Sequence, residues 1–163
     1  MSTFEIVLRL IAATLIGAAI GLNRDLRGKP IGLRTLGLVA LGSTAATLAA
    51  LQIGTPDSAS RVMQGILTGI GFLGAGVIVH RDQKSHIHRL TTAACVFLTA
   101  AIGVTCAVGN WRLIVVASLL GFAVLVLGGP LEKLVRHRLH PLDKTHPLDN
   151  VHPFDTPPGS PQE

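Results

Sequence analysis

Five long apolar runs dominate this chain and limit what it can fold into. They cover residues 4–22, 33–51, 62–79, 90–108 and 113–128. Each run is close to the roughly 17–25 residues with which a helix crosses the hydrocarbon core of a bilayer. We therefore expect an all-α membrane protein, built as a bundle of five transmembrane helices.

Composition and proline placement support the same fold. Of the 163 residues, 48% are hydrophobic and only 14% are charged, whereas about a quarter of an average soluble domain is charged. None of the nine prolines lies inside an apolar run. Because proline disrupts the hydrogen bonding of a helix interior, Pro30, Pro56 and Pro130 predict where helices end. Residues 1–130 are thus predicted to form the transmembrane domain.

Two further segments are expected after the fifth run. Residues 131–140 place leucines at helical spacing among basic residues, which predicts a short amphipathic helix on the membrane surface. Residues 141–163 contain six prolines, which predicts a disordered tail. The tail repeats His-Pro-Leu/Phe-Asp, so that His140, His146 and His152 are the weak candidates for metal ligands. An extended chain rises about 3.1 Å per residue, which puts successive histidines ~19 Å apart and favours a solvated tail.

The basic residues predict the orientation of the chain in the membrane. Eleven lysines and arginines lie on one predicted side, and only Arg61 and Arg112 lie on the other. Since cytoplasmic loops carry an excess of basic residues, we expect the N-terminus outside and the C-terminus in the cytoplasm. Nucleic acid is a rival partner for a basic chain, but no groove-reading element is visible, and no nucleic-acid partner is expected.

Small residues recur every four positions in two of the runs. In lipid, small side chains let helix backbones approach closely. Packing within one chain is the favoured interpretation, and a self-association face that makes a homo-oligomer is the alternative. Together with the glycines that follow in the third run, the residues predicted to pack helices or to form this face are Gly17, Gly21, Gly65, Gly69, Gly71, Gly74 and Gly76.

The third run contains GIGFLGAG, from Gly69 to Gly76. Its first six residues match the spacing of a dinucleotide-binding loop, but that loop follows a strand and opens a soluble helix. Here one apolar run flanks it on both sides, so no dinucleotide and no other cofactor is expected. Glycines this dense indicate either close packing, which we favour, or a locally broken helix that frees carbonyl groups for a substrate.

Polar residues at membrane depth are costly and often functional. Glu5 and Arg9 are four residues apart, which predicts an ion pair on one helix face near the outer surface. A larger set lies where the helices meet the cytoplasm, and it either anchors the topology or forms a site for an ion, an anionic solute or lipid, or a partner. This predicted polar cluster consists of Asn23, Arg24, Asp25, Arg27, Lys29, Arg34, Thr35, Thr91 and Thr92.

Two cysteines, Cys95 and Cys106, lie in the fourth run. At 1.5 Å per residue they are ~16 Å apart along one helix, which is too far for a disulfide. We expect free thiols that pack as small apolar side chains.

Three blocks of this sequence resemble the MgtC/SapB family of bacterial inner-membrane proteins. They are GLNRDLRGKPIGLRT from Gly21, SRVMQGILTGIGFLGAGVIV from Ser60 and LTTAACVFLTAAIG from Leu90. The similarity covers roughly residues 4–128. The family pattern has an acidic residue where this chain has Asn23, and Asp25 holds its second acidic position. The matching positions are Arg24, Asp25, Arg27, Lys29, Pro30, Gly32, Arg34, Thr35, Arg61, Gly65, Gly69, Gly71, Gly74, Gly76, Thr91 and Thr92.

The resemblance implies a regulatory protein linked to magnesium limitation, acid stress and virulence. Its expected partners are the lipid bilayer and other inner-membrane proteins, including the proton-translocating ATP synthase. The alternative is a small ion or solute transporter or channel. Some relatives carry a cytoplasmic ACT-like domain, which we do not expect here because only 35 residues follow residue 128. No P-loop and no nucleophile–base pair is visible, so an enzyme is not expected.

Overall fold

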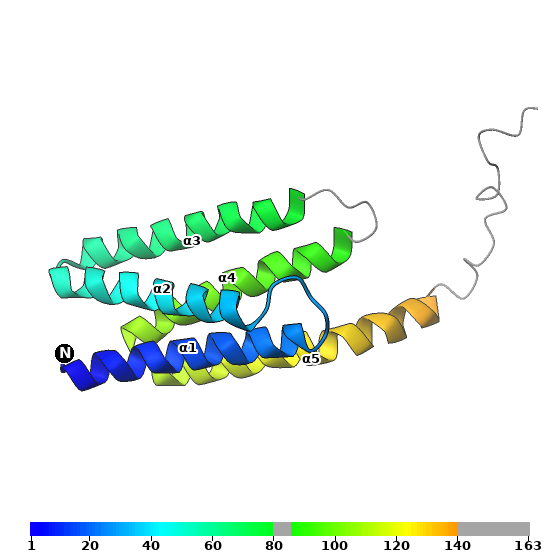
Figure 1. The fold of residues 1–163 in the computed structure, drawn as a ribbon, viewed down its shortest axis with the longest axis horizontal. Helices are drawn as coiled ribbons and strands as arrows, with labels where there is room; N and C mark the ends of the chain where they lie inside the picture. Colours follow the sequence, from blue (N-terminus) through cyan, green and yellow to red (C-terminus); the bar gives the residue numbers. More distant parts are fainter. Residues whose placement is uncertain (80–85, 140–163) are drawn as a thin grey trace, which may run out of the picture. The chain divides into compact units, whose positions relative to one another are not determined.

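Five helices form the part of the chain that the computed structural model describes, residues 1–79 and 86–139, and no strand occurs there. All five are long and apolar enough to cross a membrane, which confirms the predicted all-α fold. In chain order (Figure 1) they are α1 (Thr3–Asp25), α2 (Leu33–Ile53), α3 (Pro56–Val79), α4 (His86–Val108) and α5 (Trp111–Leu139).

The two helix limits that differ most from those predicted both involve proline. α3 begins at Pro56 rather than at residue 62, since a proline in the first helical turn loses no hydrogen bond. α5 runs through Pro130 to Leu139, whereas a separate helix was predicted over 131–140. Proline costs a helix one hydrogen bond, but its φ angle is helical, so a helix can continue through it. The tail histidines His140, His146 and His152 lie outside the described residues.

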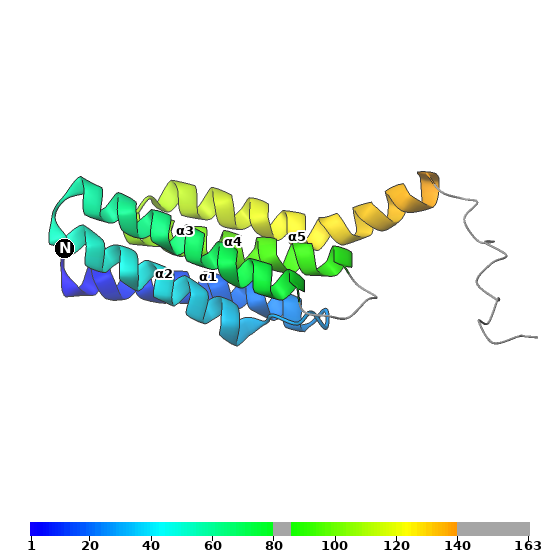
Figure 2. The ribbon, with the colours of Figure 1, turned by 90° about the horizontal axis from the view of Figure 1, so that it is seen from above.

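Residues 1–124 form one compact unit, and residues 125–139 of α5 belong to a second. In the first unit α2 and α4 pack against each other, and both contact α1 and α3 (Figures 1 and 2). The end of this bundle that holds Ser2, Gly54 and Gly109 is called the N-terminal end below. The opposite end, which holds the loop Leu26–Gly32, is called the basic end.

The centre of the bundle is a close crossing of three helices at Ala40 of α2. A Cβ atom added to Gly17 of α1 would lie 2.6 Å from the Leu36 carbonyl oxygen and 2.8 Å from the Ala40 Cβ. A Cβ atom added to Gly103 of α4 would lie 2.6 Å from the Ala40 carbonyl oxygen. Both separations are shorter than Cβ atoms tolerate, so α1 and α4 each need glycine where they meet α2.

Buried hydroxyl groups reinforce this crossing. The Thr44 Oγ1 lies 2.8 Å from the carbonyl oxygen of Ala40 in its own helix and 2.8 Å from that of Gly103 in α4. Thr47 and Thr99 donate to carbonyl oxygens one turn earlier in their own helices. Each hydroxyl therefore has the partner that a buried polar group requires, and Thr44 adds a polar link between α2 and α4.

At the N-terminal end, Arg9 of α1 caps the last turn of α4. Its guanidinium donates both to the Glu5 carboxylate and to the Ala107 carbonyl oxygen. The predicted ion pair is thus present, and Arg9 also reaches a neighbouring helix. A cation at a helix C-terminus is favourable because it meets the negative end of the helix dipole. Gly109, in the left-handed region with φ 82°, ends α4 beside the guanidinium.

The seven glycines singled out in the sequence have different surroundings. Gly17 faces α2, a Cβ atom at Gly21 would lie 2.5 Å from the Leu33 Cα, and one at Gly74 would lie 3.4 Å from the Ala93 Cβ. α3 is unbroken from Pro56 to Val79, so its glycines do not interrupt the helix. Among the seven, those where an added Cβ atom would meet nothing within 4 Å are Gly65, Gly69, Gly71 and Gly76.

We predict that Gly103→Ala destabilises the bundle by about 1–3 kcal/mol, the usual effect of overpacking. The added methyl would meet the Ala40 carbonyl oxygen, which belongs to the backbone and cannot move aside. Gly42→Ala is the matched control, because Gly42 has open space around it and alanine is the better helix former. Unfolding in mixed micelles, followed by circular dichroism, measures both. Equal stability of the two variants would contradict the close crossing.

Candidate functional site at the basic end

The loop from Leu26 to Gly32 joins α1 to α2 and is held by the end of α1. The Gly28 amide donates to the Asp25 carbonyl oxygen at 3.0 Å, and the Lys29 amide donates to that of Arg24 at 3.1 Å. Gly28 has a φ of 63°, the left-handed conformation that commonly ends helices. These bonds place Arg24 and Asp25 at the point where the chain turns from α1 towards α2.

Arg24 is buried and joins three parts of the fold. Its Nε donates to the Ile31 carbonyl oxygen at 3.0 Å, within the loop. Its Nη1 and Nη2 reach α4, at 3.1 Å from the Cys95 Sγ and 2.5 Å from the Thr92 Oγ1. The side chain therefore ties the end of α1 to both the loop and α4. Arg24, Ile31, Thr92 and Cys95 together are called the Arg24 joint.

These three partners of the Arg24 guanidinium are uncharged. A buried charge is costly unless it is paired or hydrogen-bonded. The carbonyl, hydroxyl and sulfur partners supply those bonds, and hydrogen bonds to a charged donor are stronger than neutral ones. Arg24 also lies in the last turn of α1, where the helix dipole favours a cation.

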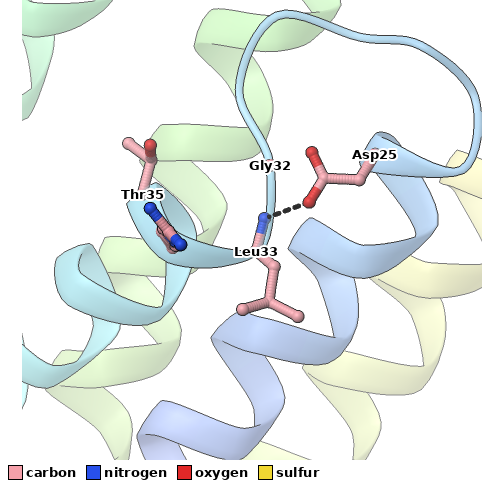
Figure 3. A pocket seen from close by; sticks show the side chains of 5 residues that line it. Asp25, Gly32, Leu33 and Thr35 are labelled. Carbon is pink, nitrogen blue, oxygen red and sulfur yellow. Dashed lines mark hydrogen bonds between the residues drawn. The ribbon is translucent and has the colours of Figure 1, made fainter.

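Asp25 points to α2 instead. Its Oδ2 accepts a hydrogen bond from the Leu33 amide at 2.8 Å (Figure 3). Gly32, the residue that precedes α2, has no side chain to cap the helix, and Asp25 takes that role from across the loop. A carboxylate at this end of a helix is favourable because the N-terminal amides are unpaired and the dipole is positive. A Cβ atom at position 32 would lie 1.5 Å from the Asp25 Oδ1, so any other residue there would push the carboxylate away from this cap.

An open pocket of about 340 Å³ lies beside this cap (Figure 3). Its lining contains a carboxylate, a guanidinium and a hydroxyl group, which together suit an ionic or polar group from a partner. Arg34 and Thr35, in the first turn of α2, are exposed. The lining residues are Asp25, Gly32, Leu33, Arg34 and Thr35.

The described residues offer no metal centre, because no three His, Cys, Asp or Glu side chains converge within 1–79 and 86–139. The weak metal candidates of the tail lie outside these ranges.

The predicted polar cluster therefore separates into buried and exposed members. Arg24 and Thr92 are buried and in contact. Thr91, next to Thr92, is exposed. Asn23 accepts a hydrogen bond from the Arg27 Nε at 3.2 Å. Lys29 is half-buried, and its backbone amide contributes to the loop.

Cys95 is the member of the Arg24 joint that the sequence interpretation missed. Both thiols are free and buried, as expected, but Cys95 also accepts from Arg24 and is more than a small apolar side chain. Its spacing of three residues from Thr92 puts both on one face of α4. From the sequence alone, that spacing could have indicated that Cys95 lies beside Thr92.

We predict that Arg24→Gln and Thr92→Val each destabilise the bundle by about 1–3 kcal/mol, because each breaks the buried hydrogen bond between Arg24 and Thr92. The double variant should lose less than the sum, since the two side chains share one contact. Arg34→Gln is the control, because Arg34 is exposed and such substitutions usually change stability by under about 0.5 kcal/mol. Unfolding in micelles checks all four proteins. Strict additivity would contradict the Arg24–Thr92 contact.

Comparisons with known proteins support the family resemblance. SrpB of Synechococcus elongatus is 39% identical over 133 residues, which cover 74% of this chain and 72% of SrpB. MgtC of Salmonella typhimurium is 42% identical over 112 residues, which cover 69% of this chain and 47% of MgtC. YhiD of Escherichia coli strain K12 is 39% identical over 132 residues, which cover 76% of this chain and 60% of YhiD.

The matched region thus spans about half the length of MgtC itself. No solved structure matches the chain. The sequence matches the MgtC family over residues 10–134, which include α2, α3 and α4 in full and most of α1 and α5. This multi-pass membrane protein belongs to the MgtC family.

Proposed function

We propose that this protein is a regulatory protein of the bacterial inner membrane that acts by binding other membrane proteins. Its N-terminus lies outside and its basic end faces the cytoplasm, in keeping with the distribution of basic residues. The processes that it regulates are adaptation to magnesium limitation and acid stress, and virulence in pathogens. The proton-translocating ATP synthase is the first partner to test. Membership of the MgtC family supports this proposal.

One observation favours binding over transport. α1, α2 and α4 meet backbone to backbone at Ala40, so that no side-chain-sized space separates them at Gly17 and Gly103. A path for an ion between these helices needs polar groups that line an opening at that depth. Here the buried hydroxyl of Thr44 is bonded to helix carbonyl oxygens.

The exposed members of the polar cluster are the proposed contacts for a partner. Arg34 and Thr35 line the pocket at the start of α2, and Thr91 is exposed near the start of α4. A guanidinium and two hydroxyl groups suit hydrogen bonding to acidic or carbonyl groups of another protein. Arg24 and Asp25 act indirectly, because they fix the ends of the helices that carry these residues.

We predict that Arg34→Gln lowers recovery of the partner from membranes roughly two- to fivefold, the effect of losing an exposed charge contact. Arg112→Gln is the matched control, since Arg112 is an exposed arginine at the N-terminal end. The tagged chain would be purified from native membranes, and subunits of the ATP synthase would be quantified by mass spectrometry. Equal recovery with wild type and both variants would remove the basic end from the interaction.

A flux measurement tests the alternative function directly. Purified protein in liposomes should show no flux of magnesium, protons or phosphate above that of protein-free vesicles. Flux that rises with the amount of folded protein would contradict the regulatory proposal and establish a transporter or channel.

A further inference from the structure

Six residues of α3 form one exposed line along the helix. Their spacings alternate between four and three, which keeps them on a single face of a helix. All six are exposed in the bundle formed by residues 1–124. This line is called the α3 stripe and consists of Asp57, Arg61, Gln64, Thr68, Gly71 and Ala75.

The chemistry of the α3 stripe does not suit lipid. Gln64 and Thr68 lie within the membrane-spanning part of α3. Neither side chain has a hydrogen-bond partner among the described residues, although both are able to donate and to accept. An amide left unpaired in hydrocarbon costs several kcal/mol. A Cβ atom added at Gly65 or Gly69, beside them, would meet no atom within 4 Å, so this face has open space over it and is polar.

α5 shows what a lipid-facing surface of this protein looks like. Its exposed positions between Trp111 and Val124 include large apolar residues at almost every turn. By contrast, the exposed large apolar residues of α3 are Phe72 and Leu73. The two helices belong to one compact unit up to Val124, and they differ in how apolar their exposed faces are. The large exposed residues of α5 in this range are Trp111, Leu113, Val115, Val116, Leu119, Leu120, Phe122 and Val124.

We propose that the α3 stripe binds the α3 stripe of a second copy of this chain. Two copies inserted in the same orientation are related by a two-fold axis along the membrane normal, so their α3 helices run parallel and each residue faces its counterpart. The Gln64 amide pairs with the Gln64 amide of the second copy, because each amide both donates and accepts. Gly71 and Ala75 let the backbones approach, as small residues do between membrane helices.

The charges at the N-terminal end of the stripe are also self-complementary. Asp57 and Arg61 are one turn apart on the same face, and both are exposed. Within the residues that the structure describes, no salt bridge involves either side chain. In a parallel pair the two acids lie at one level and the two bases one turn further along, so that the four charges form one cluster that is neutral overall. A surface that carries donor and acceptor, acid and base together favours a copy of itself over a partner of one charge. This inference is independent of the proposed regulatory function.

Cysteine cross-linking in liposomes that contain only this purified chain tests the proposal. Thr68→Cys, Gly71→Cys and Ala75→Cys should each give a disulfide-linked dimer with copper phenanthroline. The wild type should give none, since its own cysteines are buried. Leu73→Cys and Leu119→Cys are the matched controls, because both positions are exposed but lie off the stripe. Absence of dimer at all three stripe positions, or equal dimer at the control positions, would overturn the proposal.

A dilution experiment measures the contribution of the polar pair. Energy transfer between labelled copies at falling protein-to-lipid ratios gives the dimer dissociation constant. Gln64→Leu combined with Thr68→Val should raise this constant roughly 3- to 30-fold, the range expected for interhelical hydrogen bonds in membranes. Leu119→Ala should leave it unchanged. A wild-type chain that is folded by circular dichroism yet monomeric at every ratio would rule out a second copy as the occupant of the stripe.

Discussion

The contact of the α2 backbone with α1 and α4 at Ala40 is the constraint on which the rest of the structure depends. Because Gly17 and Gly103 carry no side chains, α1 and α4 approach α2 from two sides at the distance of backbone contact. This closeness lets the Thr44 hydroxyl reach Gly103 of α4. It also brings the end of α1 near enough to α4 for Arg24 to reach Thr92 and Cys95. The polar end of the bundle is thus a result of how its apolar middle packs.

Two adjacent charges at that end serve opposite helix termini. Arg24 lies in the last turn of α1, where a cation is favoured, and Asp25 caps the first turn of α2, where an anion is favoured. Successive residues of a helix point about 100° apart, which lets one bond α4 while the other bonds α2. Arg24 and Asp25, which belong to the segment that resembles the family, therefore stabilise the fold in addition to any contact with a partner.

The number and place of the spans followed from the sequence because membrane insertion depends on local apolarity. The glycine spacing predicted close packing, but it could not say against what, since Gly17 and Gly65 look alike until the helices are placed. Thr91 and Thr92 show the same limit, because helix rotation, which tertiary packing sets, buries one and exposes the other. The cap from Asp25 to Leu33 depends on the path of a loop, which no periodic pattern encodes.

α5 is at once the most apolar of the five spans and the one least buried by its neighbours. The crossing at Ala40 lies within α1, α2 and α4, and the Arg24 joint lies within α1, α4 and the loop that joins α1 to α2. The free energy that holds α5 in the bilayer therefore comes mainly from the transfer of its apolar side chains from water to lipid, and less from contacts with the other helices. The first four helices make nearly all of their helix–helix contacts with one another and few with α5, so their packing depends little on the last span.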